Sequence, residues 1–218
     1  MQRVSQTYDV TEIPAREAGI AAARSALSRG EPVVLPTDTV YGIGVDAFNP
    51  QAVAVLLAAK GRNRTMPPPV LIGRAEVMEA LATDIPESAR ELAATFWPGA
   101  LTLILQAQPS LAWDLGETRG TVALRMPADE VALDLLGAVG PMAVSSANRT
   151  GAPAATTAAA AQAMLSESVA VYLNDGERAH QQASTIVDCT TGSPTVVRQG
   201  AIPLHELQAV VAEVVAPE

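Results

Sequence analysis

The sequence predicts a mixed α/β fold built on a sheet that is at least partly antiparallel. Short apolar runs bounded by proline, glycine or polar residues alternate with helical segments through most of the chain. Three strand-like runs then follow one another at 169–173, 184–189 and 194–198, a succession that favours a mixed sheet over a doubly wound parallel one. With 218 residues, of which 49% are hydrophobic and 17% charged, the chain can bury one substantial core.

The first third of the chain predicts a helix, a strand and a second helix. Residues 14–29 have helical periodicity, and prolines enclose the apolar strand 33–35. The second helix, 50–60, has strong signals at both ends, because Asn49 is a favoured N-cap and Gly61 a favoured C-terminal stop. We therefore expect these boundaries to hold within a residue or two.

The middle of the chain is punctuated by prolines. A stiff loop at 66–69 leads into a short strand at 70–72. Helical segments follow at 74–82 and 86–95, and a β-rich run covers 101–105. Strands and helices thus alternate, but not strictly, because two helical segments follow each other here.

Two strands and two helices are predicted before the three consecutive late strands, and one helix is predicted after them. A β-rich run at 121–126 precedes an amphipathic helix at 127–138. A strand at 142–146 ends in polar residues, an Ala-rich helix covers 156–166, and a terminal helix covers 203–215. Asp129 and Glu130 stand at the start of the first of these helices, where acidic residues favour the helix dipole, so they do not indicate a catalytic pair.

The composition excludes several classes of protein. Two histidines and one cysteine cannot build a Cys/His zinc cluster or a disulfide framework, which indicates a reducing, cytoplasmic environment. The longest apolar stretch, 52–59, is far shorter than the ~20 residues that span a bilayer, and the N-terminus lacks a signal peptide's apolar segment. We expect no membrane association.

The charge of the chain is acidic, while its cations are concentrated. Acidic residues outnumber basic ones 23 to 14, for a net charge of -9 and a pI near 4.7, which argues against a large nucleic-acid surface. Lys60 is the single lysine and lies in a cluster of three cations at 60–64. That cluster is interpreted either as a solvated basic patch or as a local anion site in which Arg62 grips phosphate or carboxylate.

Three further polar groups fall at predicted strand ends or in loops. Hydroxyls stand beside glycines at 36–44, and short hydrogen-bonding side chains follow a strand at 145–151. Arg125 and Arg198 occur on predicted strands. Each group has an ordinary alternative, namely a turn, a helix cap or an arginine that reaches solvent. Neither a phosphate-binding loop of the Gly-x-x-x-x-Gly-Lys type nor a Gly-x-Gly-x-x-Gly motif is present.

Six segments taken together resemble the Sua5/YrdC family, the L-threonylcarbamoyladenylate synthases. They are PTDTVYGIG at 36–44, KGR at 60–62, FWPGALT at 96–102, TVALRMP at 121–127, SAN at 146–148 and STIVD at 184–188. Each segment alone is common, but their order and spacing are specific to this family, and the resemblance covers nearly the whole chain.

The resemblance implies a twisted mixed sheet curled around a concave cleft and flanked by helices, with 1–218 as one catalytic domain. We expect no appended C-terminal domain of the kind found in longer members. The implied activity is that of a nucleotidyltransferase, which makes threonylcarbamoyl-AMP and pyrophosphate from L-threonine, bicarbonate or carbon dioxide, and ATP with Mg²⁺. A separate tRNA threonylcarbamoyltransferase complex would use the product to modify adenosine 37 of ANN-decoding tRNAs, so this chain would not itself require stable nucleic-acid binding.

The resemblance also implies roles for individual residues. Thr39 and Arg125 would hold threonine. The ATP and intermediate site would be lined by Lys60, Arg62, Thr121, Ser146, Asn148, Ser184 and Arg198, among which Lys60, Arg62, Ser146 and Asn148 would be catalytic. Metal ligands are not indicated. The chain departs from the family pattern at Met66 and at Leu71, where some members carry a histidine that touches threonine.

Two other functions fit parts of the sequence. An RNA-binding or ribosome-associated module is disfavoured by the acidic pI and by the presence of only seven aromatic residues. The carbamoyl-transfer domain of hydrogenase maturation proteins is related, but it occurs in much longer chains that contain zinc.

Overall fold

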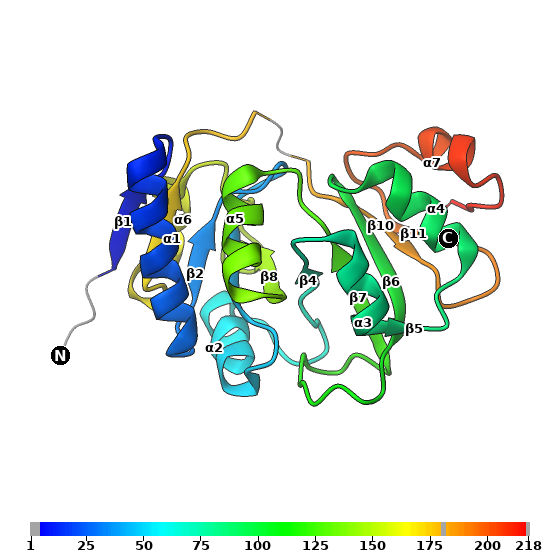
Figure 1. The fold of residues 1–218 in the computed structure, drawn as a ribbon, viewed down its shortest axis with the longest axis horizontal. Helices are drawn as coiled ribbons and strands as arrows, with labels where there is room; N and C mark the ends of the chain where they lie inside the picture. Colours follow the sequence, from blue (N-terminus) through cyan, green and yellow to red (C-terminus); the bar gives the residue numbers. More distant parts are fainter. Residues whose placement is uncertain (1–4, 180–181, 217–218) are drawn as a thin grey trace.

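A mixed sheet of eleven strands runs through the molecule, as seen in a computed structural model that describes residues 5–179 and 182–216. Its strands are β1 (Gln6–Asp9), β2 (Val33–Leu35), β3 (Gly42–Asp46), β4 (Val70–Leu71), β5 (Ala82–Thr83), β6 (Leu101–Ala107), β7 (Thr121–Arg125), β8 (Met142–Ser146), β9 (Val171–Asn174), β10 (Thr185–Asp188) and β11 (Thr195–Arg198). Their order across the sheet is β1-β9-β2-β3-β8-β4-β7-β6-β10-β11, and β5 pairs with β6 at one side of this path (Figure 1).

The sheet is mixed, as the sequence predicts. The pairs β1–β9, β2–β9, β4–β7 and β6–β10 are parallel, whereas the other six pairs are antiparallel. Of the three consecutive late strands, β10 and β11 form an antiparallel pair, while β9 joins the opposite end of the sheet. The chain after β9 therefore crosses from one half of the molecule to the other (Figure 1).

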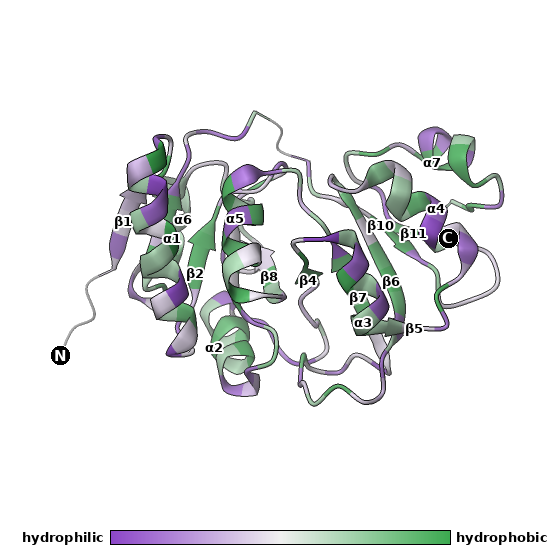
Figure 2. Ribbon diagram, in the orientation of Figure 1, coloured by the Kyte–Doolittle hydropathy of each residue, from purple (hydrophilic) through white to green (hydrophobic). Residues whose placement is uncertain are grey.

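Helices cover both faces of the sheet. They are α1 (Ile13–Ser28), α2 (Pro50–Lys60), α3 (Met78–Leu81), α4 (Glu87–Phe96), α5 (Glu130–Val139), α6 (Ala158–Leu165) and α7 (Leu204–Val210), with 3₁₀ turns η1 (Ala75–Val77) and η2 (Ser166–Ser168). On β2, Val33 and Leu35 pack into one core cluster with α1 and α5, whereas Val34 packs into a second cluster with α2 and α6. This alternation follows from the two-residue period of a strand. Figure 2 shows β2 and β6 coloured mainly as hydrophobic, whereas the edge strand β1 is hydrophilic.

Strand β6 shows how the sheet faces the site. Leu101, Leu103 and Leu105 are fully buried in the core cluster that also contains apolar residues of α4 and α7. Thr102 and Ile104 point to the opposite face, where they line a cavity. One face of β6 thus packs into the core, and its other face lines the cavity.

Several predicted helix boundaries are confirmed and others are wrong. For α2, the side chain of Asn49 accepts a hydrogen bond from the backbone of Ala52, and Gly61 adopts the left-handed conformation that ends the helix. The predicted helix at 127–138 begins only at residue 130, because Asp129 is its N-cap. The predicted terminal helix ends at 210 because the chain then turns back to pair beside β11. The segment 74–82 forms η1 and the single turn α3 rather than one helix.

The strands β1, β3 and β5 were not predicted. In β3, Gly42 and Gly44 lie against Val144 on the neighbouring strand β8, where an added Cβ would be 2.6 Å and 2.9 Å from its methyl groups. Glycine has low strand propensity, so the segment suggested a loop, but the close packing in the folded sheet requires it. The polar segment predicted at 36–44 is a loop only over 36–41, because residues 42–46 form the central strand β3.

In the described part of the chain, none of the helices combines the length and the apolar character needed to cross a membrane.

Candidate active site

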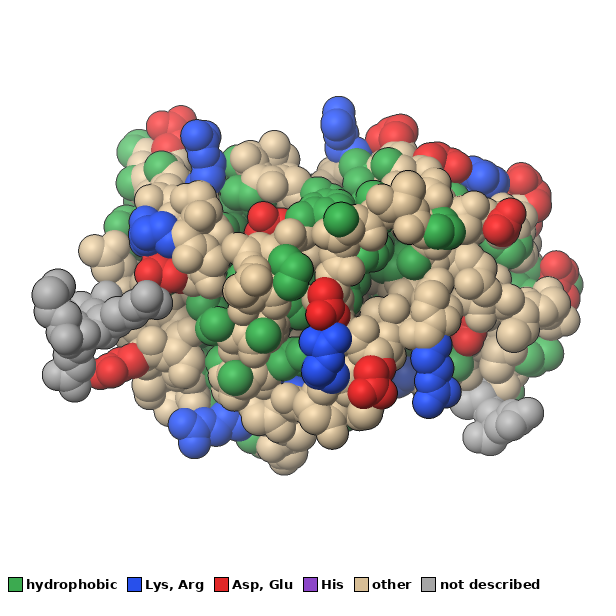
Figure 3. All heavy atoms as spheres, turned by 90° about the horizontal axis from the view of Figure 1, so that it is seen from below, with side chains coloured by type: hydrophobic (Ala, Val, Ile, Leu, Met, Phe, Trp, Pro, Cys, Tyr) green, Lys and Arg blue, Asp and Glu red, His purple; other side chains and the backbone are tan. Residues whose placement is uncertain are grey.

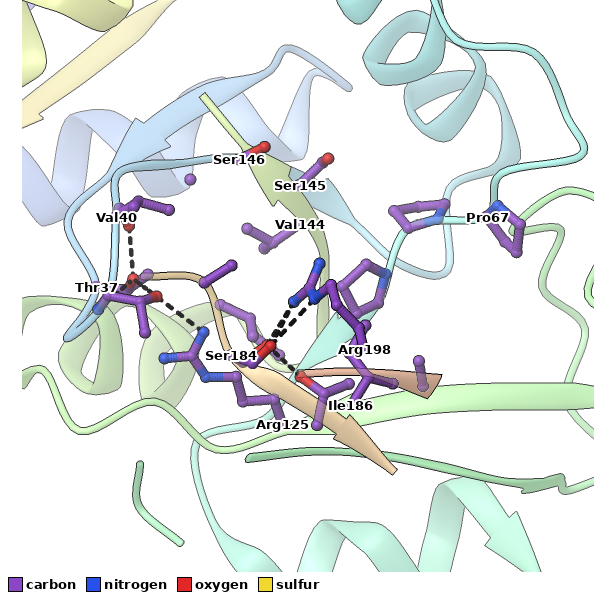
Figure 4. A pocket seen from close by; sticks show the side chains of 18 of the residues that line it. Thr37, Val40, Pro67, Arg125, Val144, Ser145, Ser146, Ser184, Ile186 and Arg198 are labelled. Atoms are coloured by element: carbon purple, nitrogen blue, oxygen red, sulfur yellow. Dashed lines mark hydrogen bonds between the residues drawn. The ribbon is translucent and has the colours of Figure 1, made fainter. Parts of the chain in front are cut away.

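A cavity of about 360 Å³ opens beside the middle and one end of the sheet. Side chains of β4, β6, β7, β8, β10 and β11 line it, together with the polar loop that precedes β3 and the proline loop before β4 (Figure 4). Its volume is within the range of small-molecule sites, and its walls combine apolar side chains with hydroxyls and arginines. These are the features of a ligand-binding cavity.

Arg125 lies at the end of β7 and is held on three sides. Its Nε donates to the backbone oxygen of Gly99 at 2.9 Å, and its terminal nitrogens donate to Thr39 Oγ1 at 3.0 Å and to Asp38 Oδ1 at 2.7 Å. Burial lowers the pKa of Arg125, and the charge of Asp38 counteracts this effect. A guanidinium carries five N–H donors, so two remain for a ligand. This fixed fork suits a carboxylate.

Thr39 is held by Arg125 and Thr37. The hydroxyl of Thr37 donates to the backbone oxygen of Val40 at 2.6 Å, and the Oγ1 atoms of Thr37 and Thr39 are 3.0 Å apart (Figure 4). Because the proton of Thr37 is committed to Val40, the hydroxyl of Thr39 donates to Thr37 and accepts from Arg125. Thr39 can therefore accept one more hydrogen bond, but it has no proton left to donate.

Arg198 and Ser184 form the opposite wall. Arg198 reaches from β11 and donates to the backbone oxygen of Ser184 at 2.7 Å and 3.1 Å and to its hydroxyl at 3.0 Å. That hydroxyl lies 2.8 Å from Thr102 Oγ1 on β6. Strand β6 and the residue just before β10 thus fix the arginine of β11 at the cavity (Figure 4).

Arg178 is held by two carboxylates and lies over an aromatic ring. Its guanidinium pairs with Asp129 at 2.8 Å and with Asp175 at 2.7 Å, and it lies 5.5 Å from the ring centre of Tyr41. Asp129 also accepts from the backbone of Ala132 as the N-cap of α5, which confirms its structural interpretation. Burial raises the pKa of Asp129, although the charge of Arg178 opposes the shift.

Three arginines converge on the cavity. Arg62, Arg125 and Arg198 all line it, and the described lining contains no aspartate or glutamate. Partial burial lowers the pKa of Arg198, and the charges of Arg125 and Arg62 lower it further. Like charges repel one another, so this arrangement favours a ligand that carries several negative charges.

Lys60 and Asn148 lie behind the cavity wall rather than on it. Lys60 is 1% exposed, and its ammonium group donates to the backbone oxygens of Ser146 and Asn148, the latter at 2.7 Å. Burial, with a smaller contribution from Arg62, lowers the pKa of Lys60 to about 8. The side-chain amide of Asn148 donates to Arg149 and Ala152. Both residues support the turn that follows β8.

The structure brings most of the residues singled out from the sequence into one place. The members that line the cavity are Thr39, Arg62, Thr121, Arg125, Ser146, Ser184 and Arg198. The residue roles assigned from the sequence did not include Thr37, although it lies in the polar segment 36–44, or Thr102. These side chains are 3% and 1% exposed and organise this site through Thr39 and Ser184. For Thr102 a signal was available, because it interrupts the leucines of β6 at the alternate position.

The described residues do not build a metal site of their own. None of their histidine, cysteine, aspartate and glutamate side chains gather in groups of three or more that could hold an ion.

Comparison with known proteins assigns the family. The model of the Sua5/YciO/YrdC family, described as telomere recombination, matches residues 25–200. The chain belongs to the Sua5/YciO/YrdC family. It is 50% identical to a Mycobacterium leprae relative over 216 residues, which cover 99% of this chain and 98% of that one.

Relatives from Pyrococcus abyssi and Bacillus subtilis are among those named threonylcarbamoyl-AMP synthase. Identity is 37% to the Pyrococcus abyssi protein over 196 residues and 38% to the Bacillus subtilis protein over 210 residues. These matches cover 89% and 94% of this chain, but 58% and 60% of the relatives. The chain thus spans about three fifths of these two longer proteins.

Solved structures of the family confirm the fold. P. abyssi Sua5 complexed with L-threonine superposes with a TM-score of 0.87 at 33% identity, covering 99% of this chain and 62% of that one. Escherichia coli YciO superposes with a TM-score of 0.79 at 22% identity, covering 93% of this chain and 97% of that one, which supports the fold alone.

Proposed function

We propose that the protein is a threonylcarbamoyl-AMP synthase, a nucleotidyltransferase that forms threonylcarbamoyl-AMP and pyrophosphate from L-threonine, bicarbonate or carbon dioxide, and ATP. The observation that carries this proposal is the convergence of Arg62, Arg125 and Arg198 on one cavity whose described lining lacks carboxylates. Such a site suits substrates that bring a triphosphate and a carboxylate together. The names of the P. abyssi and B. subtilis relatives support the same activity.

The threonine end of the cavity is assigned to Arg125 and Thr39. The two unused N–H donors of Arg125 match the two oxygens of a carboxylate. Thr39 accepts a hydrogen bond from the hydroxyl of the bound amino acid, because its own proton is directed at Thr37. This pair would select an amino acid with a hydroxyl close to its carboxylate.

The nucleotide end is assigned to Arg62, Thr121, Ser146, Ser184 and Arg198. The arginines stabilise the negative charge that builds on the departing pyrophosphate, and the hydroxyls orient the nucleotide. Lys60 and Asn148 are positioning residues in this proposal, because they hold the turn that presents Ser146 to the cavity.

The reaction needs positioned substrates and no protein nucleophile. The amine of threonine attacks carbon dioxide to form a carbamate, and one proton is released. A carbamate oxygen then attacks the α-phosphorus of ATP, and the bond to the bridging oxygen of pyrophosphate breaks. Holding the reactants together and stabilising charge account for catalysis of this kind.

We also propose a metal ion, a partner and a cellular location for the enzyme. ATP enters as its magnesium complex, so Mg²⁺ is required with the substrate. The labile product passes to a separate tRNA threonylcarbamoyltransferase complex for modification of adenosine 37, and the enzyme works in the cytoplasm.

The direct test is to incubate purified protein with ATP, threonine, bicarbonate and magnesium. We expect pyrophosphate release that depends on threonine, together with threonylcarbamoyl-AMP detected by mass spectrometry. Pyrophosphate release at the same rate without threonine would contradict the proposal. An inactive Arg125→Met variant of unchanged melting temperature would serve as the matched control.

A further inference from the structure

The segment 62–66 carries one of the three cavity arginines, yet little holds it in place. Its local hydrogen bonds join Arg62 to the end of α2 and close a turn between Asn63 and Thr65. Nε of Arg62 is buried and has no hydrogen-bond partner among the described residues. Because Nε makes no hydrogen bond that would fix the side chain, the orientation of the Arg62 guanidinium depends on the position of its backbone.

A turn at 114–117 supplies the distant contacts of this segment. Arg64 donates to both carboxylate oxygens of Asp114 at 2.7 Å and 3.0 Å, and the backbone of Glu117 donates to the backbone oxygen of Arg64 at 2.7 Å. Within the described structure, every hydrogen bond from 62–66 to a remote part of the chain ends on Asp114 or Glu117. The two loops are thus joined by one ion pair and one backbone hydrogen bond.

Asp114 also shapes its own turn. Its Oδ1 accepts from the backbone of Gly116 at 3.0 Å while the same atom accepts from Arg64. Gly116 has a φ of +107°, and a Cβ there would stand 2.7 Å from the backbone oxygen of Arg64. The turn is therefore in close contact with the backbone of Arg64, two residues after Arg62.

The neighbours of Asp114 connect the same turn to the cavity and to α2. Leu115 is 3% exposed and lines the cavity, as do the prolines that follow 62–66. Trp113 stacks on Phe48, which precedes α2, with ring centres 5.4 Å apart and an angle of 20° between the rings. The loop before β7 is thereby tied to both ends of the α2 region.

We infer that Asp114 is a positioning residue for Arg62. It fixes the turn 114–117 against Arg64, and this contact places the backbone that aims Arg62 into the cavity. The inference rests on the proposed function, in which Arg62 meets the phosphates of ATP. Asp114 itself does not line the cavity, so its effect falls on the nucleotide and leaves the threonine end, held by Arg125, unchanged.

The test compares Asp114→Ala with wild type and with Glu79→Ala. Glu79 and Arg90 form another exposed ion pair, on α3 and α4, and neither residue lines the cavity, so Glu79→Ala is a matched control. We expect Asp114→Ala to bind magnesium-ATP roughly fivefold more weakly by calorimetry, a loss that an exposed ion pair can supply. The KM for threonine should change less than twofold, and Glu79→Ala should match wild type in both measurements.

Two further variants keep the test decisive if Asp114→Ala is unstable. Arg64→Ala removes the other half of the contact and leaves the hydrogen bond between Asp114 and Gly116, so it should weaken ATP binding to a similar extent. The double variant Asp114→Ala/Arg64→Ala should be no weaker than the weaker single variant, because both act through one contact.

Three results would count against the assignment, and a fourth would count against the proposed function. Wild-type affinity for magnesium-ATP in Asp114→Ala and Arg64→Ala would overturn the role of Asp114, as would equal losses of ATP and threonine affinity. Additive losses in the double variant would also contradict it. If wild type itself bound no magnesium-ATP, the proposed function would fail instead.

Discussion

Single residues in the cavity are specified by the hydrogen bonds that they have already made. Thr39 has given its proton to Thr37 and one lone pair to Arg125, so a ligand meets it as an acceptor. Arg125 has committed three of its five donors and offers the other two. The unligated site is thus already ordered to receive a particular set of ligand atoms.

Replacing Thr39 by valine tests this reasoning. Thr39→Val keeps the shape but removes the acceptor and leaves a donor of Arg125 without its partner. We expect the KM for threonine to rise about tenfold, as for the loss of one buried hydrogen bond. Wild type should also release pyrophosphate faster with threonine than with valine, and this difference between the two amino acids should be smaller in the variant. An unchanged preference, measured by pyrophosphate release, would exclude Thr39 from hydroxyl recognition.

Lys60 gives a pH dependence of stability. Its pKa is lowered to about 8 in the folded protein, against 10.5 for an ordinary lysine. Between these two values the unfolded chain holds a proton that the folded protein has released, so this residue makes the free energy of unfolding rise with pH. Urea unfolding of wild type and Lys60→Met at several pH values should show wild type gaining stability relative to the variant from pH 8 to 10.5. A constant difference would contradict the lowered pKa.

At the scale of elements, capping residues and prolines predicted the helices well because their effects are local. The start of α2 at Asn49 and its end at Gly61 follow from hydrogen bonds within a few residues. Strand β3 could not be predicted, because the reason for its glycines is the side chain of Val144, which lies about a hundred residues away in the sequence. Contacts of that kind arise only in the folded sheet.

Two glycine substitutions should therefore have opposite effects. Gly42→Ala places a Cβ 2.6 Å from a methyl group of Val144, and we expect the free energy of unfolding to fall by about 1–3 kcal/mol. In α5, Gly137 faces open space, so Gly137→Ala should raise it by roughly 0.5–1 kcal/mol. Denaturant unfolding measures both. Adding Val144→Ala to Gly42→Ala should restore part of the lost free energy of unfolding. If it restored none, crowding against Val144 would not be the cause of the loss.

The whole molecule combines an acidic surface with a cationic interior site. The net charge is -9, and on the face shown in Figure 3 the basic side chains are separate and stand near acidic ones. Long-range attraction of a polyanion is therefore weak, whereas the three arginines act on a ligand at short range.

This charge distribution predicts how the enzyme depends on salt and RNA. We expect magnesium-ATP affinity to fall only modestly between low and physiological salt, because the charges that bind it are partly enclosed. Affinity should increase when threonine and bicarbonate are present. Nuclease-treated protein should form threonylcarbamoyl-AMP at the same rate with and without added tRNA. A strict requirement for tRNA would favour an RNA-binding role.

The fold class and most of the site could be predicted from the sequence, but the arrangement of the parts could not. Periodicity indicated a mixed sheet, and the six segments indicated which residues belong together. The strand order is decided by long-range pairing, such as β9 between β1 and β2, which periodicity does not encode. The same is true of Lys60, because its place behind the wall depends on the turn that follows β8.

The burial of Lys60 has a chemical consequence for a protein that makes an acyl adenylate. Such mixed anhydrides acylate free amines and thiolates. The single lysine of this chain is 1% exposed, and Cys189 is 3% exposed, with burial raising the pKa of its thiol to about 12. The remaining basic side chains are arginines and two histidines, and a guanidinium stays protonated and is a poor nucleophile. The proposed product can thus remain in the cavity without finding a lysine or cysteine side chain of its own enzyme to modify.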